Sequence, residues 1–90
     1  DFNKAIELDP YYAPPYNNRG ILSHKAKDYV SAINDFDKAI ELDINYSKAY
    51  LNRGITKQMI RDEEGACEDW EKAYNLGVKL VKKYIINDCY

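Results

Sequence analysis

The side chains that could do chemistry in this chain of 90 residues are few, since it has two cysteines and one histidine. A metal site or a catalytic dyad combines several such groups, but Cys67, Cys89 and His24 show no metal-ligand or nucleophile spacing. No Gly-rich phosphate loop, HExxH or CxxC motif occurs either. We therefore expect that the chain is not an enzyme and needs neither a cofactor nor a metal ion.

Each candidate has a structural interpretation that we favour over a chemical one. Cys67 is expected to be a small core residue on the inner face of its helix, and Cys89 to lie in a fraying tail without a role. His24 is expected to be solvated on a helix face. The acidic run 62–64 falls in the first turn of a predicted helix, where the helix dipole favours carboxylates over a metal or acid–base role.

The composition argues against several classes of partner. Lys and Arg total 13 while Asp and Glu total 15, so the net charge is −2. Neither nucleic acid nor an anionic membrane surface is expected to attract such a chain. No apolar stretch approaches the roughly 20 residues of a membrane span. No signal peptide is visible, so a cytoplasmic location is expected by default.

The elements that position these residues follow from an internal repeat. When residue 1 is aligned with residue 35, the segments 1–21 and 35–55 are identical at 14 positions, and a weaker third copy follows. A fixed period of this length is typical of duplicated supersecondary units. Within each unit the apolar residues recur every three or four positions, which predicts α-helices rather than strands.

Six helices are predicted, two for each complete unit. Asp28 is expected to be an N-cap, and Gly77 to end a helix. The first helix has no visible N-cap before its apolar pattern, and Asp1 is not an initiator Met, so we expect a piece of a longer protein. The predicted ranges are 1–8, 14–26, 29–42, 47–60, 63–76 and 78–88.

A helix–turn–helix unit of this period and with this order of residues resembles the tetratricopeptide repeat (TPR). The positions that carry the resemblance are Tyr16, Gly20, Ala32, Phe36 and Ala39 in one unit, and Tyr50, Gly54, Ala66, Trp70 and Ala73 in the next. It implies an all-α fold, a right-handed α-solenoid of antiparallel helix pairs. It also implies the C-terminal part of an array, divided into the second helix of a truncated unit (1–12), two units (13–46 and 47–77) and a capping helix (78–90).

Arginine replaces the family's leucine at two equivalent positions, Arg19 and Arg53. A partly buried arginine needs a partner, because an unpaired charge is costly to bury. We expect structural ion pairs with Asp35 and Asp69, and as second choices Asp1 for Arg19 and Asp35 for Arg53. Arginines directed at a ligand are the alternative.

The resemblance also implies that the first helix of each unit lines a concave groove that binds peptides. The expected groove residues are Asn17, Asn18, Ile21, His24, Lys25, Lys48, Leu51, Asn52, Ile55, Gln58 and Met59. Asn18 and Asn52 occupy equivalent positions and are expected to hydrogen-bond an extended backbone. Asn18 and Lys48 also match two positions of the clamp with which some TPR domains bind chaperone C-termini, but Asn52 stands where that clamp has a basic residue.

The predicted function is therefore that of a scaffold for protein–protein interaction, which binds a peptide or protein segment in the concave groove. The alternative is a self-association or spacer module without peptide binding, in which case a homo-oligomer is expected. The sequence does not identify the partner.

Overall fold

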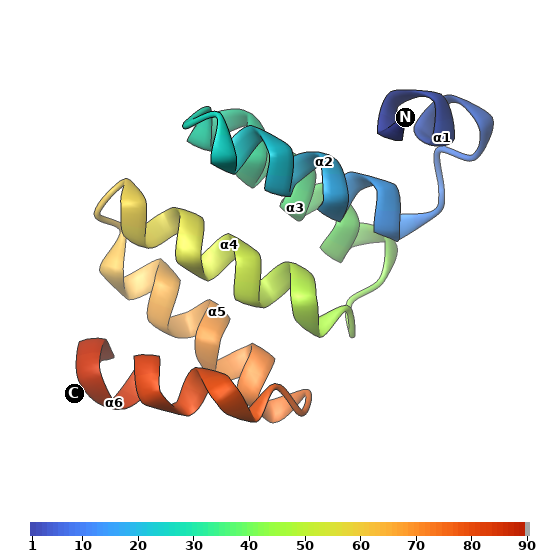
Figure 1. Ribbon diagram of the computed structural model, residues 1–90. Helices are drawn as coiled ribbons and strands as arrows, with labels where there is room; N and C mark the ends of the chain where they lie inside the picture. Colours follow the sequence, from blue (N-terminus) through green and yellow to red (C-terminus); the bar gives the residue numbers. More distant parts are fainter. Residues whose placement is uncertain (90) are drawn as a thin grey trace.

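The computed structural model describes residues 1–89, which form six α-helices and one short 3-10 helix. The elements are α1 (Phe2–Leu8), α2 (Ala13–Lys25), α3 (Tyr29–Leu42), α4 (Ser47–Met59), α5 (Glu63–Asn75), η1 (Lys79–Val81) and α6 (Lys82–Cys89) (Figure 1). The described residues contain no strand, so the predicted all-α class is confirmed. The expected capping range 78–90 includes Tyr90, which lies outside the described residues.

Aspartates begin three of the helices. The side chains of Asp28 and Asp62 each accept a hydrogen bond from the backbone N–H three residues later, as the prediction for Asp28 required. Asp1 does the same for the N–H two residues later, at 2.8 Å. The expectation that the first helix lacks an N-cap was therefore wrong, because Asp1 lies outside α1 and is itself the cap.

A residue with left-handed backbone follows three of the helices, α2, α4 and α5. Gly77 follows α5 with φ = 107°, in agreement with its predicted role at a helix end. Lys27 and Arg61 also have positive φ, 65° and 66°, although neither is glycine. They lie at equivalent positions of the two units, in the turns that join α2 to α3 and α4 to α5.

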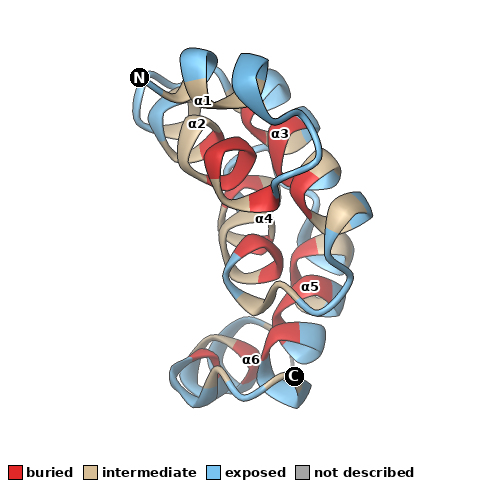
Figure 2. Ribbon diagram, turned by 90° about the vertical axis from the view of Figure 1, so that its right-hand side faces the viewer, coloured by how far each residue is buried: buried red, intermediate tan, exposed pale blue. Residues whose placement is uncertain are grey.

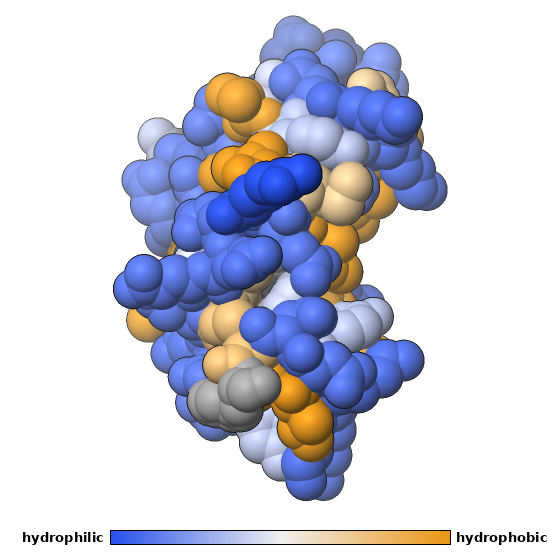
Figure 3. All heavy atoms as spheres, turned by 90° about the vertical axis from the view of Figure 1, so that its left-hand side faces the viewer, coloured by the Kyte–Doolittle hydropathy of each residue, from blue (hydrophilic) through white to orange (hydrophobic). Residues whose placement is uncertain are grey.

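Successive helices run antiparallel and stack into a curved array (Figure 1). The closest pairs are α2 with α3 and α4 with α5, while α6 packs on α5. Buried positions lie where these helices face one another, with α2, α4 and α6 on the inner side of the curve (Figure 2). The surface is mainly hydrophilic on the side of the turns after α2 and α4, and the outline is hollowed along the inner side (Figure 3).

Small residues let the helices of each pair approach closely. A Cβ atom on Gly54 would lie 2.6 Å from the indole nitrogen of Trp70 and 3.2 Å from the carbonyl oxygen of Ala66. A Cβ atom on Gly20 would lie 2.6 Å from the ring of Phe36. Both glycines are therefore required by close packing and not by backbone conformation.

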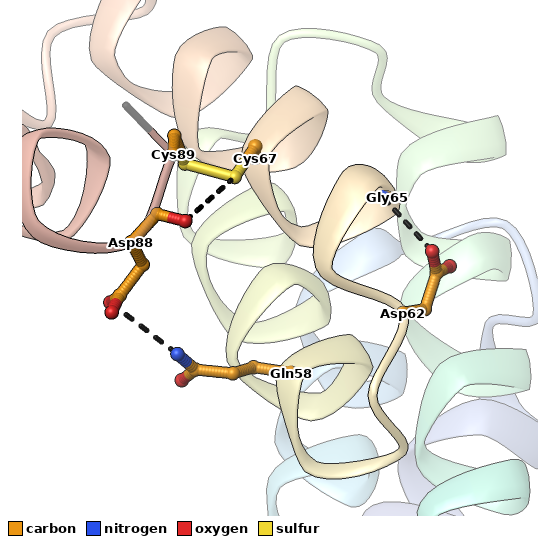
Figure 4. Close-up of a disulfide and its surroundings, with 6 residues drawn as sticks. All are labelled: Gln58, Asp62, Gly65, Cys67, Asp88 and Cys89. Atoms are coloured by element: carbon orange, nitrogen blue, oxygen red, sulfur yellow. Dashed lines mark hydrogen bonds between the residues drawn. A yellow bond between two sulfur atoms is a disulfide. The ribbon is translucent and has the colours of Figure 1, made fainter.

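A disulfide joins Cys67 of α5 to Cys89 at the end of α6 (Figure 4). Cys67 packs against the buried cluster around Trp70, as predicted for a small core residue, but the bridge was not expected. The prediction that Cys89 lies in a fraying tail without a role was wrong. Helix α6 lies antiparallel to α5 and extends to Cys89, which brings the two Cα atoms within 5.8 Å. Disulfides persist in oxidising compartments and are rare in the cytosol, so this bridge weighs against the default cytoplasmic location.

Candidate peptide-binding groove

The two arginines bind the carboxylates that the sequence predicts. Arg19 donates from Nε and Nη2 to both oxygens of Asp35, at 2.8 and 2.7 Å. Arg53 makes the same two-point bond to Asp69, at 2.9 and 2.7 Å. These hydrogen bonds raise the pKa of Arg53 above its ordinary value, since they favour the charged guanidinium. The arginines are therefore part of the framework, and the alternative of ligand-directed arginines is wrong.

The third hydrogen bond of each arginine crosses to the preceding helix pair. Arg19 donates to Asn3, at 2.9 Å, and Arg53 donates to Asp37, at 2.8 Å. The expected second partners were Asp1 and Asp35, which are each two residues earlier in the sequence. Each guanidinium thus joins three helices and fixes the angle between neighbouring units.

Equivalent tyrosines fix the junctions between units in the same way. The hydroxyl of Tyr16 donates to the carbonyl oxygen of Pro10, and that of Tyr50 to the carbonyl oxygen of Ile44, both at 2.9 Å. Each ring also lies within reach of the arginine three positions later, at 5.8 and 5.6 Å from the guanidinium carbon. Together these contacts make a rigid frame for the inner helices.

A cavity of about 150 Å³, which we name the α2–α4 pocket, opens between these inner helices. Its lining consists of Ile21, His24, Lys25, Phe36, Asn52, Ile55 and Thr56. The pocket brings together residues from two successive units, of which five were expected in the groove. Its walls are mainly apolar, with polar groups at a few positions, as in most ligand pockets.

His24 is bound to the framework and is not simply solvated, contrary to the prediction. Its Nδ1 lies 2.9 Å from the hydroxyl of Thr56, which is itself fully buried. That hydroxyl donates its only proton to the carbonyl oxygen of Asn52, at 2.9 Å. His24 must then donate from Nδ1, which leaves Nε2 as an acceptor when the ring is neutral. The ring also packs edge-on against Tyr29, with centroids 5.3 Å apart.

The asparagines occupy different environments from those expected. Asn17 is 3% exposed and accepts a hydrogen bond from the side-chain amide of Asn52, at 3.1 Å. Asn17 therefore links α2 to α4 and does not face an open groove. Asn52 still lines the α2–α4 pocket, with one of its two amide protons committed to Asn17. Asn18 is half-buried and does not line this pocket.

The remaining expected groove residues lie outside the α2–α4 pocket. Leu51 is half-buried and packs against the cluster that contains Tyr50 and Trp70. Gln58 donates to Asp88 of α6, at 3.4 Å. Lys48 and Met59 are exposed. Sequence reasoning missed two of the lining residues. Phe36 was assigned to the packing between helices, and Thr56 has Leu22 at the equivalent position of the preceding unit, so no repeat points to it.

None of the helices formed by residues 1–89 is long and apolar enough to cross a membrane. No group of three or more His, Cys, Asp or Glu side chains in this part of the chain is placed to hold a metal ion.

The curved stack of antiparallel helix pairs and its inner groove define a helical-repeat protein, an α-solenoid. A family model described as "Tetratricopeptide repeat" matches residues 2–34. Comparison with solved structures gives many matches, while comparison with curated proteins finds no similar sequence. The family match, the internal repeat and the structural matches together show that the chain belongs to the TPR family, whose right-handed superhelix it shares.

Three solved structures illustrate the similarity. YrrB, described as a TPR protein with an unusual peptide-binding site, is 32% identical over 86% of this chain and 40% of its own, with a TM-score of 0.83. The first TPR of Spaghetti (RPAP3), bound to the HSP90 peptide SRMEEVD, is 29% identical over 84% of this chain and 60% of its own, with a TM-score of 0.82. The Arabidopsis OM64 TPR domain is 27% identical over 93% of this chain and 74% of its own, with a TM-score of 0.86. The chain thus spans less than two thirds of the length of YrrB and of the Spaghetti TPR structure.

Proposed function

We propose that the inner groove binds an extended segment of a partner protein and that one apolar side chain of that segment enters the α2–α4 pocket. The observation that carries this proposal is the pocket itself. Ile21, Phe36 and Ile55 form apolar walls, and the paired arginines and tyrosines hold those walls rigid. A preformed pocket lowers the entropic cost of binding, because its own side chains are already ordered.

Polar groups around the pocket suit the backbone of such a segment. Asn52 has a second amide proton in addition to the one donated to Asn17. The His24 ring offers Nε2 as an acceptor, since its Nδ1 is held by Thr56. A donor and an acceptor at the rim can pair with a peptide group regardless of the side chains that flank it. This replaces the expected Asn18–Asn52 ladder with a pair formed by Asn52 and His24.

Some similar solenoids are described with a bound peptide or a peptide-binding site. The first TPR of Spaghetti is described as bound to an HSP90 peptide, and the yeast Sti1 TPR2B domain as a complex with a pHsp70 peptide, at 29% and 25% identity to this chain. These neighbours support a protein-interaction module. They do not transfer their ligands to this chain, because Asn52 offers an amide where a clamp for carboxylates needs a cation.

Peptide selection followed by calorimetry tests the proposal. Peptides selected on the wild-type protein from a random display library are titrated into wild type, Ile55→Ser and Val30→Ser. Ile55→Ser shortens a pocket wall and is expected to weaken binding by about fivefold or more, from the lost apolar contact. Val30, which is 69% exposed and does not line the pocket, is the matched control and is expected to change nothing.

Equal affinity for wild type and Ile55→Ser would contradict the proposal. In that case the alternative of a self-association module gains support if the sedimentation coefficient of the wild-type protein rises with concentration. Circular dichroism of both variants confirms that each is folded before the affinities are compared.

A further inference from the structure

The turn that joins α3 to α4 carries a motif that the groove does not use. Residues 45–47 read Asn-Tyr-Ser, an asparagine followed by a residue other than proline and then by a serine. This is the acceptor motif for N-linked glycans. No other asparagine of the chain has serine or threonine two positions later. The motif is short and arises by chance in many chains, so its surroundings determine whether it can act.

The side chain of Asn45 is accessible and uncommitted. The residue is exposed and lies in the turn, just before Ser47 begins α4. Its backbone N–H donates to the carboxylate of Asp43, at 3.1 Å, which fixes the turn. Its side-chain amide makes no hydrogen bond to another residue of the described range 1–89. A sugar on this nitrogen therefore displaces no polar contact of the fold.

Other asparagines of the chain serve the fold itself. Asn17 is 3% exposed and accepts from the side-chain amide of Asn52, at 3.1 Å. Asn3 accepts from the guanidinium of Arg19, at 2.9 Å. These side chains join neighbouring helix pairs, and a sugar on their nitrogens would meet the helices beside them. Asn45 thus differs from them both in sequence context and in freedom.

The disulfide is a second and independent observation. The bridge between Cys67 and Cys89 is of a kind that persists in oxidising compartments, such as the lumen of the endoplasmic reticulum. An N-linked glycan likewise belongs to the surface loops of secreted proteins. The motif and the bridge lie on different elements, and each indicates the same surroundings for the chain.

We propose that Asn45 is the acceptor of an N-linked glycan, whose donor is an oligosaccharide attached to a polyprenyl diphosphate. A bond forms between Nδ2 of Asn45 and the anomeric carbon of the first sugar. The bond from that carbon to the diphosphate oxygen breaks, the polyprenyl diphosphate leaves with the bonding electrons, and the amide releases one proton. Ser47 completes the motif but is half-buried in the first turn of α4, so the transfer precedes the formation of this helix.

The fold places this glycan away from the α2–α4 pocket. The turn at Asn45 lies at the opposite end of the helices from the turns that follow α2 and α4 (Figure 1). His24 lines the pocket near the end of α2, and Ile55 lines it about 12 Å along α4 from Ser47. The glycan stands instead beside Ile44, which is 67% exposed. The inference is therefore independent of the proposed function.

Cell-free translation in the presence of endoplasmic-reticulum microsomes tests the acceptor directly. A cleavable signal sequence is placed before residue 1, and protection from added protease identifies the chains that have entered the lumen. The protected wild-type chain is expected to show a gel shift of one glycan, which peptide:N-glycosidase F removes. Because the transfer precedes folding, the result does not depend on the stability of the variants.

Matched variants assign the shift to the motif. Asn45→Gln and Ser47→Ala are each expected to abolish it, while Ser47→Thr keeps the motif and is expected to retain it. Asn34→Gln changes an exposed asparagine outside the motif and is also expected to retain it. Protected wild-type chains without a shift would overturn the inference, and so would a shift that survives Asn45→Gln.

Mass spectrometry of the protein isolated from its natural source tests whether the acceptor is used there. Peptide:N-glycosidase F converts a glycosylated asparagine to aspartate, so the tryptic peptide 39–48 is expected to be heavier by the mass of that conversion. The same peptide with unmodified Asn45, found before any enzyme treatment as the main form, would overturn the inference.

Discussion

The pair α2–α3 and the pair α4–α5 have the same frame but present different surfaces to the groove. Both contain the tyrosine that bonds a preceding carbonyl oxygen and the arginine that binds an aspartate at two points. The residues beside that frame differ: Phe36 corresponds to Trp70, and His24 to Gln58. Repeated positions therefore specify the arrangement of the helices, and the positions that do not repeat give each unit a different surface.

The ion pairs of the two units also differ in burial. The side chains of Arg53 and Asp69 are 18% and 5% exposed, whereas those of Arg19 and Asp35 are 37% and 12% exposed. Asp69 has a second cation, because the Lys57 amine lies 3.3 Å from it. The position equivalent to Lys57 in the first unit is a serine. The cluster around Asp69 thus contains more charged groups than the Arg19–Asp35 pair and is less exposed to water.

The largest effect is expected when these aspartates are removed. Asp69→Ala leaves the Arg53 guanidinium poorly paired in a mostly buried site and is expected to lower the free energy of unfolding by about 3–5 kcal/mol. Asp35→Ala is expected to cost clearly less, since water reaches Arg19 and screens its charge. Urea denaturation of both variants measures the difference. Equal losses would show that the two ion pairs are energetically alike in spite of their burial.

A second test of the comparison removes the bridge between α5 and α6, which has no counterpart next to the α2–α3 pair. The Cys67→Ser, Cys89→Ser double variant is expected to lower the free energy of unfolding by about 2–4 kcal/mol, because the closed loop between positions 22 residues apart is opened in the unfolded chain. Hydrogen exchange is expected to rise in α6 while α2 and α3 keep their protection. A uniform rise over all helices would contradict this local role.

The third test concerns the two glycines at the helix crossings. Gly54→Ala is expected to cost about 1–2 kcal/mol, because the new methyl group meets Trp70 and the backbone oxygen of Ala66, which cannot move aside. Gly20→Ala meets only the ring of Phe36 at close range and is expected to cost less, since a gain in helix propensity offsets part of the strain. Thermal unfolding ranks the variants, and the reverse order would contradict the packing argument.

The smallest effect, and the one in which the two units are expected to agree, concerns the turns. Lys27 and Arg61 have nearly the same positive φ, 65° and 66°. Replacing either by glycine relieves the strain of a side chain in this conformation, although glycine also gains entropy in the unfolded chain. Each variant is expected to be more stable in thermal unfolding, by up to about 1 kcal/mol. A gain in one unit only would show that the turns are not equivalent.

The sequence predicts the frame well because each feature of the frame occurs twice. The repeat period gives the helices, and it gives Arg19–Asp35 and Arg53–Asp69 from the same register. The groove is predicted less well, because its hydrogen bonds join positions that have no equivalent partner. The bond of His24 to Thr56 exists only between these two units, and Asn17 is buried by contact with Asn52.

Sequence reasoning misses the disulfide for a related reason. The pairing of Cys67 with Cys89 depends on how α6 docks on α5, and the segment 78–90 does not repeat the residues before it. One signal does extend the period: Tyr84 is the repeat equivalent of Tyr50, and its ring packs against Trp70 with centroids 5.5 Å apart. Aligning this tyrosine with the earlier ones places α6 against α5.

The bridge also determines how the solenoid responds to mechanical load. Tension applied to the two ends of the described chain reaches Cys89 and passes through the sulfur atoms directly to Cys67. The chain between these positions, which is worth about 70 Å of extension when fully stretched, is shielded from that tension while the bridge is intact. Under force the residues between the two cysteines therefore extend only after the bridge is reduced.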